Sequence, residues 1–175
     1  MTPLRVTSAV VGVMMLILVG IMATRDSGND RMTTYLVGEA APEIKAETLR
    51  GELWDLDNQR GRWVLVNFFS TTCVPCVKEH PELVKFSEDH ERADDVRIVT
   101  VSFSDTETAV KEFFELNGGD WPVLASDTER VAVDWGVVAV PESYLVSPSG
   151  FVAAKVLGGV TQNYLEGLLA EVQTK

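Results

Sequence analysis

Cysteine is scarce in this chain of 175 residues, which contains only Cys73 and Cys76. A disulfide between two cysteines this close in sequence closes a very small loop, so it cannot join distant parts of a fold. Cross-linking for stability is therefore excluded as the reason for the pair. The two residues instead indicate a reactive dithiol or part of a metal site.

Positive charge is also in short supply. The sequence has 15 Lys and Arg residues against 26 Asp and Glu residues, which gives a formal net charge of -11. No basic stripe interrupts this acidity, and a protein that binds nucleic acid needs Lys and Arg to neutralise phosphates. We therefore expect no nucleic-acid partner and assign the charge mainly to solubility.

Charged residues are absent from residues 6–24 near the N-terminus. A transmembrane helix requires about 20 apolar residues. We therefore expect a cytoplasmic stub over residues 1–5, a single transmembrane anchor over residues 6–24 and a linker over residues 25–35. A cleaved signal peptide is the alternative, although its apolar region usually has about 7–15 residues. Either segment would place residues 36–175 on the extracytoplasmic side, periplasmic or extracellular, and an uncleaved anchor would hold them at the cell membrane.

Residues 36–175 have the pattern of one α/β domain. Short alternating runs predict a β-hairpin over residues 44–56, and nearly unbroken apolar runs predict buried central strands. The predicted strands cover residues 63–69, 96–103, 121–124, 140–146 and 151–157, and the predicted helices cover residues 74–90, 106–117, 128–135 and 161–172. A βαβ unit followed by a hairpin and a helix predicts one mixed β-sheet flanked by helices on both faces.

The most specific pattern is Cys73-Val74-Pro75-Cys76, which follows a predicted central strand and opens a predicted helix. A CxxC pair beside a βαβ unit is typical of a thioredoxin-like redox site. The N-terminus of a helix favours an anion, so Cys73 is predicted to be the nucleophilic thiolate. Cys76, one turn deeper, would resolve a mixed disulfide by attacking the sulfur of Cys73.

Glu79, three residues after Cys76, is the candidate proton shuttle for the buried thiol. Partial burial would raise its pKa and let it accept or donate a proton as disulfides exchange. A solvent-exposed helix glutamate is the alternative interpretation. His80 and His90 are interpreted as residues of the helix surface.

The segment from Trp63 to Phe69, the CxxC pair, Glu79 and Pro81 together resemble the thioredoxin superfamily. Two further stretches, VGEAAPE at residues 37–43 and GVVAVPESYLV at residues 136–146, are similar to its membrane-anchored TlpA/ResA/DsbE-like branch of cytochrome c maturation. The similarity extends over residues 36–160. It implies a thioredoxin fold with an N-terminal β-hairpin extension.

The resemblance also implies how a substrate binds. The Val140–Pro141 peptide bond is expected to be cis, in a loop that faces the CxxC pair. Val140 would then offer its backbone to an extended substrate peptide, and Glu142 would lie near the same groove. The sequence departs from the family directly before Cys73, where Thr72 stands in place of the usual tryptophan.

These features predict a thiol:disulfide oxidoreductase with a redox-active Cys73–Cys76 disulfide and without a metal or cofactor. We expect a monomer that reduces disulfides of exported proteins, and the resemblance implies apocytochrome c as the client. A membrane thiol electron donor would re-reduce the pair, because the compartment is oxidising. The sequence does not decide between reductase and oxidase, since the reduction potential sets the direction.

Two other functions stay open at this point. A copper metallochaperone for an oxidase could use Cys73, Cys76 and His80, because a histidine four residues after a cysteine lies one helical turn away. A peroxiredoxin-like peroxidase is the second alternative. Its PxxxTxxC pattern is not matched, since Thr71 is two rather than three residues before Cys73 and the required proline is absent.

Overall fold

The computed structural model describes residues 12–18, residue 20 and residues 35–174. Residues 12–18 are helical, and no helix among the residues described is long and apolar enough to cross a membrane. The stub over residues 1–5, much of the anchor over residues 6–24 and nearly all of the linker over residues 25–35 lie outside the described residues. The anchor therefore stays a prediction.

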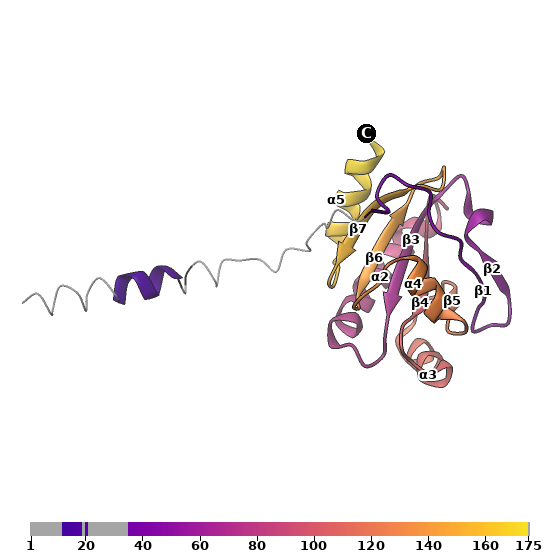
Figure 1. Ribbon diagram of the computed structural model, residues 1–175, viewed down its shortest axis with the longest axis horizontal. Coiled ribbons are helices and arrows are strands. Elements are labelled where there is room, and N and C mark those ends of the chain that lie inside the picture. Colours follow the sequence, from indigo (N-terminus) through magenta and orange to yellow (C-terminus); the bar gives the residue numbers. More distant parts are fainter. Residues whose placement is uncertain (1–11, 19, 21–34, 175) are drawn as a thin grey trace, which may run out of the picture.

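A five-stranded mixed sheet forms the centre of the domain (Figure 1). Its strand order is β5-β4-β3-β6-β7. The strands are β3 (Trp63–Phe69), β4 (Val96–Ser102), β5 (Val123–Leu124), β6 (Glu142–Val146) and β7 (Val152–Leu157). β3, β4 and β5 are parallel, whereas β6 runs antiparallel to both β3 and β7. The predicted mixed sheet is therefore confirmed.

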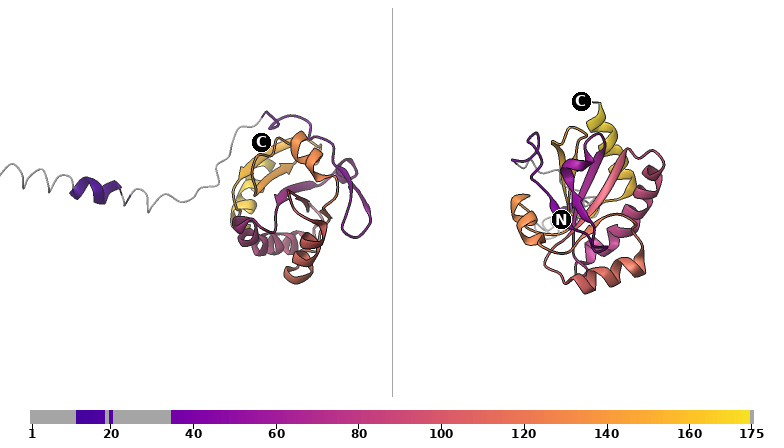
Figure 2. Two further views of the ribbon diagram at one scale, coloured as in Figure 1. Left: turned by 60° about the horizontal axis from the view of Figure 1, so that its bottom comes forward. Right: turned by 90° about the vertical axis from the view of Figure 1, so that its right-hand side faces the viewer.

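Helices cover both faces of this sheet (Figure 2). The helices are α2 (Val74–Glu91), α3 (Glu107–Asn117), α4 (Thr128–Asp134) and α5 (Gln162–Gln173). Buried side chains of α2, α3 and α5 belong to one hydrophobic core, and buried side chains of α4 belong to the core on the other face. The helix that begins at the cysteine pair is thus packed along its length against the sheet.

Strand β3 supplies side chains to both cores. Val64, Val66 and Phe68 lie in the core beneath α4, and Leu65 lies in the core beneath α2 and α5. Because side chains alternate along a strand, Asn67 faces the same side as Leu65. It is completely buried. The central strand therefore directs one polar side chain toward the helix that carries the cysteines.

The N-terminal hairpin forms a separate two-stranded antiparallel sheet. Its strands are β1 (Lys45–Glu47) and β2 (Leu53–Asp55), and a short 3-10 helix, η1 (Leu56–Gln59), follows them. The predicted hairpin is therefore confirmed as an addition beside the main sheet rather than a part of it.

Backbone hydrogen bonds attach this N-terminal extension to both outer strands of the main sheet. The N–H of Leu49 donates to the carbonyl of Val123 in β5, with an N···O distance of 2.9 Å. The N–H of Gly38 donates to the carbonyl of Val152 in β7 at 2.8 Å. The extension therefore lies beside the start of β7 and beside β5, at opposite sides of the sheet.

Candidate active site

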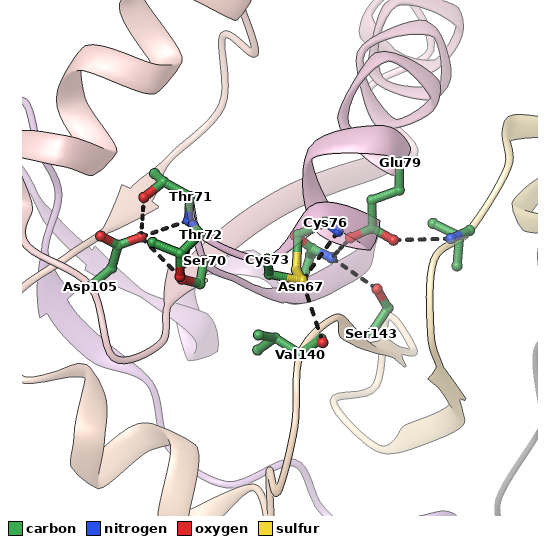
Figure 3. Close-up of a disulfide and its surroundings, with 11 residues drawn as sticks. Asn67, Ser70, Thr71, Thr72, Cys73, Cys76, Glu79, Asp105, Val140 and Ser143 are labelled. Atoms are coloured by element: carbon green, nitrogen blue, oxygen red, sulfur yellow. Dashed lines mark hydrogen bonds between the residues drawn. A yellow bond between two sulfur atoms is a disulfide. The ribbon is translucent and has the colours of Figure 1, made fainter.

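Cys73 and Cys76 form a disulfide at the start of α2, with their Cα atoms 5.3 Å apart (Figure 3). Cys73 is the N-cap residue, and the N–H of Cys76 points at its sulfur with an N···Sγ distance of 3.2 Å. Cys76 is fully buried, whereas Cys73 is partly exposed. Cys73 is thus the more exposed half of the disulfide, and it lies at a helix N-terminus that would stabilise its thiolate after reduction.

Local sequence explains why a helix can begin here. Pro75 lies in the first turn of α2, where a backbone N–H has no partner within the helix, so its absence costs nothing. The N–H of Cys73 donates to the carbonyl of Ser70 at 3.1 Å, which closes a turn between β3 and the helix. This short turn places Cys73 directly beyond the end of the central strand.

Asp105, in the loop between β4 and α3, holds that turn in place (Figure 3). Its Oδ2 accepts hydrogen bonds from the N–H of Thr71 at 2.6 Å, the hydroxyl of Thr71 at 2.7 Å and the hydroxyl of Ser70 at 3.2 Å. Burial acts to raise the pKa of Asp105, but these bonds and one from the N–H of Thr106 outweigh it and hold that pKa below its usual range. Asp105 could not be predicted from the pattern around the cysteines, because it lies 34 positions after Thr71.

Glu79 is buried one helical turn after Cys76, and only 2% of its surface is exposed. Its Oε1 accepts a hydrogen bond from Nδ2 of Asn67 and its Oε2 accepts one from the N–H of Val160, each at 2.9 Å. Burial raises the pKa of Glu79 to about 7, although the two hydrogen bonds favour the carboxylate and act in the opposite direction. The predicted burial is confirmed, and the group can exchange a proton near neutral pH.

Asn67 connects three elements of the site. In addition to its bond with Glu79 on α2, its Nδ2 lies 3.1 Å from Oγ of Ser143 on β6. Its Oδ1 is buried and has no hydrogen-bond partner among the described residues. Asn67 was predicted only as part of a buried strand, yet a single polar residue within an apolar run is a signal that could have identified it.

The loop between α4 and β6 faces the disulfide (Figure 3). The Val140–Pro141 peptide bond is cis, as the resemblance implied. The carbonyl oxygen of Val140 lies 3.4 Å from Sγ of Cys73. Val140 is half-buried and Pro141 is buried. The backbone of Val140 therefore lies directly beside the disulfide.

Glu142 lies elsewhere than predicted. It is 1% exposed, and it pairs with Phe68 in the β3–β6 register, where Asn67 pairs with Ser143. Paired residues point to the same face and successive residues to opposite faces, so Glu142 faces away from Glu79 across the sheet. The expectation that Glu142 lies near the substrate groove and binds the client is therefore corrected for its side chain, which is buried and contacts Lys155, Tyr144 and the N–H of Val138 instead.

The prediction of a surface position for His80 is wrong, because α3 and the loop after it cover this side of α2. His80 is 2% exposed, and its ring centre lies 4.9 Å from that of Phe113, 5.0 Å from Phe114 and 5.5 Å from Trp121. Its Nε2 lies 3.0 Å from the carbonyl oxygen of Gly118. Desolvation in this aromatic surrounding lowers the pKa of His80.

His90 is also mostly enclosed, with 12% of its side chain exposed between Asp95 at 2.8 Å and Glu166 at 3.2 Å. No group of three or more His, Cys, Asp or Glu side chains in the described part of the chain could hold a metal ion. Because Nε2 of His80 already contacts a backbone carbonyl, the structure does not favour a copper site of Cys73, Cys76 and His80.

Comparisons with known proteins agree with this geometry. The sequence matches the AhpC/TSA family over residues 37–155. The thiol:disulfide interchange protein HelX of Rhodobacter capsulatus is 30% identical over 166 residues, which are 93% of this chain and 88% of HelX. The thiol-disulfide oxidoreductase ResA of Bacillus subtilis is 32% identical over 129 residues, which are 73% of this chain and 71% of ResA.

A solved structure has the same fold. The thioredoxin domain of a thiol-disulfide oxidoreductase from Bacteroides vulgatus superposes with a TM-score of 0.69 at 26% identity, and the match covers 79% of this chain and 98% of that domain. The predicted thioredoxin-like fold is thereby confirmed.

Proposed function

The chain belongs to the AhpC/TSA family and is a thioredoxin-like thiol:disulfide oxidoreductase of the HelX and ResA type, and we propose that it reduces the disulfide bonds of exported proteins. One observation carries this proposal. Cys73 is partly exposed and its sulfur lies beside the carbonyl of Val140, while Cys76 is fully buried. A client disulfide can therefore reach the sulfur of Cys73, whereas the sulfur of Cys76 is available only for the second step.

The reaction follows from this order of exposure. In the reduced enzyme the Cys73 thiolate attacks one sulfur of the client disulfide, which forms a mixed disulfide and releases the other client sulfur as a thiolate. The Cys76 thiolate then attacks Sγ of Cys73. This step restores the Cys73–Cys76 bond and releases the second client thiolate, so two electrons pass from the enzyme to the client.

Glu79 supplies the proton chemistry of the second step. A buried thiol resists ionisation, so Cys76 must give up a proton before it becomes nucleophilic. We assign Glu79 as the acceptor of that proton, because its carboxylate lies one turn further along α2 and its pKa of about 7 is close to the working pH. In the reverse direction the protonated carboxyl returns the proton to Cys76.

The client is expected to bind as an extended chain. The backbone of Val140 lies beside the reactive sulfur, and an extended peptide can pair with such a segment through main-chain hydrogen bonds. Two exposed apolar side chains are close in sequence to the residues of this site: Val74, directly after Cys73, is 63% exposed, and Val138, two residues before Val140, is 84% exposed. These features favour an unfolded client with apolar residues next to its cysteines.

The proposed location is the extracytoplasmic side of the cell membrane, and the uncharged stretch over residues 6–24 supports it. Apocytochrome c is the proposed client class, because its CxxCH thiols must be reduced before haem attaches. A membrane thiol electron donor would then restore the reduced enzyme, since an oxidising compartment does not keep thiols reduced.

A trapping experiment tests the chemistry and the client together. In the full chain with Cys76→Ala, the mixed disulfide cannot be resolved and should accumulate in membranes. Clients released by reductant are then identified by mass spectrometry, with Cys73→Ala as the matched control that captures none. Captured apocytochromes would support the proposal. Equal capture by the control would contradict the assigned nucleophile, and a set of clients without cytochromes would exclude that client class.

The direction of the reaction is tested by the reduction potential of the Cys73–Cys76 pair in a glutathione redox buffer. A reductase should have a potential of about -270 mV or lower, whereas a value near -120 mV is that of a strong oxidant. The second value would contradict the proposed direction.

A further inference from the structure

A buried ion pair lies on the face of the sheet beneath α4. Nζ of Lys155 is 2.8 Å from Oε2 of Glu142, and the two side chains are 8% and 2% exposed. Nζ also lies 4.9 Å from the ring centre of Tyr144, which is opposite Lys155 in the β6–β7 register. Burying two charges costs free energy unless further contacts satisfy them. The other hydrogen bonds of the Glu142–Lys155 pair therefore matter, because they show which segment of the chain the pair is bonded to.

Those contacts reach the segment that leads to the disulfide. The hydroxyl of Tyr144 donates to the carbonyl of Trp135, the residue that caps the end of α4, at 2.6 Å, and its oxygen lies 3.2 Å from Oε2 of Glu142. One hydroxyl proton serves one acceptor, and the shorter contact is with Trp135. Oε1 of Glu142 accepts a hydrogen bond from the N–H of Val138 at 3.4 Å. The network is therefore bonded to the chain at Trp135 and again three residues later.

Two residues of this segment, Val138 and Ala139, contribute no packing, whereas Val137 and Val140 are partly buried against the core. Val138 is 84% exposed and Ala139 is also exposed, so their side chains do not fix the loop. The next residue is Val140, whose carbonyl oxygen lies 3.4 Å from Sγ of Cys73. The position of that carbonyl therefore depends on the packing of Val140 against the core and on the hydrogen bonds that the network makes to the backbone at Trp135 and Val138.

We propose that Glu142, Lys155 and Tyr144 form a positioning network that holds residues 136–140 where an extended client pairs beside Cys73. This inference rests on the proposed thiol:disulfide exchange with protein clients. The three side chains do not touch the reacting sulfurs; they act through the backbone of Val140. Loosening the network lowers the fraction of molecules whose loop is ready for the client, and the apparent affinity falls in proportion.

The test compares two variants of the full chain, Lys155→Met and Tyr144→Phe, with a matched control. Lys45→Met makes the same chemical change at a lysine that is 51% exposed and 3.7 Å from Asp55. For a peptide disulfide, we expect Lys155→Met to raise KM about tenfold, Tyr144→Phe to raise it less, and Lys45→Met to leave it as in the wild type. The effect on kcat, and on reduction of a small aromatic disulfide that cannot pair with Val140, should be smaller.

Amide hydrogen exchange of residues 136–140 supplies a readout that does not depend on activity. The amides of this segment should exchange faster in both network variants and at the wild-type rate in Lys45→Met. A KM unchanged in both network variants would overturn the inference, and so would a raised KM with unchanged exchange in this segment.

Two further outcomes are distinguishable. A wild-type protein that does not reduce the peptide disulfide would contradict the proposed function, while the exchange rates would still decide whether the network holds the loop. Lys155→Met leaves a buried carboxylate unpaired and can fail to fold. In that case Tyr144→Phe, which removes only one hydroxyl, decides the inference by the same two measurements.

Discussion

The side-chain amide of Asn67 donates a hydrogen bond to the carboxylate of Glu79, with 2.9 Å between Nδ2 and Oε1. Asn67 is completely buried on the central strand and Glu79 is 2% exposed on α2. A donor at this position favours the charged carboxylate and offsets part of the rise in pKa that burial produces. The strand therefore adjusts the proton affinity of the carboxylate that we propose as the proton acceptor of the buried thiol.

Replacing Asn67 with leucine should raise the pKa of Glu79 above its value of about 7. Leucine has a similar size and no donor, so burial is kept while a hydrogen bond to the carboxylate is lost. The pKa is measured by following the Glu79 carboxyl carbon with NMR across a pH series of the oxidised protein. Ser143→Ala, which removes only the other contact of the Asn67 amide, should change it far less. A wild-type pKa in the leucine variant would disprove this role of Asn67.

Glu79→Gln should change how the free energy of unfolding depends on pH. The pKa of Glu79 is about 7 in the folded protein against 4.5 ordinarily, so its protonated form stabilises the fold below pH 4.5, and this stabilisation is lost as the pH rises through 7. The difference between these two pKa values corresponds to about 3 kcal/mol of unfolding free energy. Urea unfolding of the oxidised protein between pH 4.5 and 8.5 should show this loss in the wild type and not in the variant. Glu88→Gln, an exposed position on the same helix, should keep the wild-type slope; equal slopes in all three proteins would refute the prediction.

His80, the neighbour of Glu79, should affect stability with the opposite sign. Desolvation lowers the pKa of His80 below 6.5, so the folded state holds it neutral. Its contribution to stability is present above pH 6.5 and is lost as the pH falls through the folded pKa. His80→Phe should therefore flatten the acid side of the stability profile, and at pH 7.5 it should cost about 1 kcal/mol for the bond to Gly118.

The two neighbouring effects are separated by placing His80→Phe in the Glu79→Gln background and repeating urea unfolding from pH 7.5 to pH 5. The Glu79→Gln protein alone should lose stability on acidification, and the double variant should lose less. Identical profiles for these two proteins would show that His80 does not contribute.

Asp105→Ala should destabilise the turn before Cys73. Loss of the carboxylate that binds Ser70 and Thr71 should lower the free energy of unfolding at pH 7 by about 1–3 kcal/mol. The loss should shrink in acid, because the pKa of Asp105 is lowered in the folded state and its contribution falls away as the carboxylate is protonated. Asp134→Ala, which breaks an exposed ion pair with Arg130, is the control and should cost less than about 1 kcal/mol. Equal losses in the two variants would show that the turn does not depend on Asp105.

Local patterns were sufficient to predict the central elements. The predicted strand over residues 63–69 is observed as Trp63–Phe69, and the predicted helix over residues 74–90 is observed as Val74–Glu91. A nearly unbroken apolar run and a proline in the first helical turn are properties of neighbouring residues, so the sequence displays them directly. The same holds for Glu79, whose place relative to Cys76 follows from the helix alone.

Contacts between distant segments could not be predicted in this way. Asp105 meets Thr71 across 34 positions, and Val160 meets Glu79 across 81. Nothing in the sequence pattern states that these residues pair. The same limit explains the error at His80, since its helix looks exposed there until α3 is packed over it. Lys155 and Glu142 could be recognised as partners only once the β6–β7 register was known.

The attachment of the N-terminal extension to β5 and β7 has a consequence for self-association. An outer strand with unpaired backbone groups can add a strand from another copy of the protein and begin an aggregate. Here the N–H of Leu49 occupies the carbonyl of Val123, and the N–H of Gly38 occupies that of Val152. A shortened chain that began after Leu49 would leave the carbonyls of Val123 and Val152 without these partners. It should precipitate at concentrations where the longer chain stays in solution.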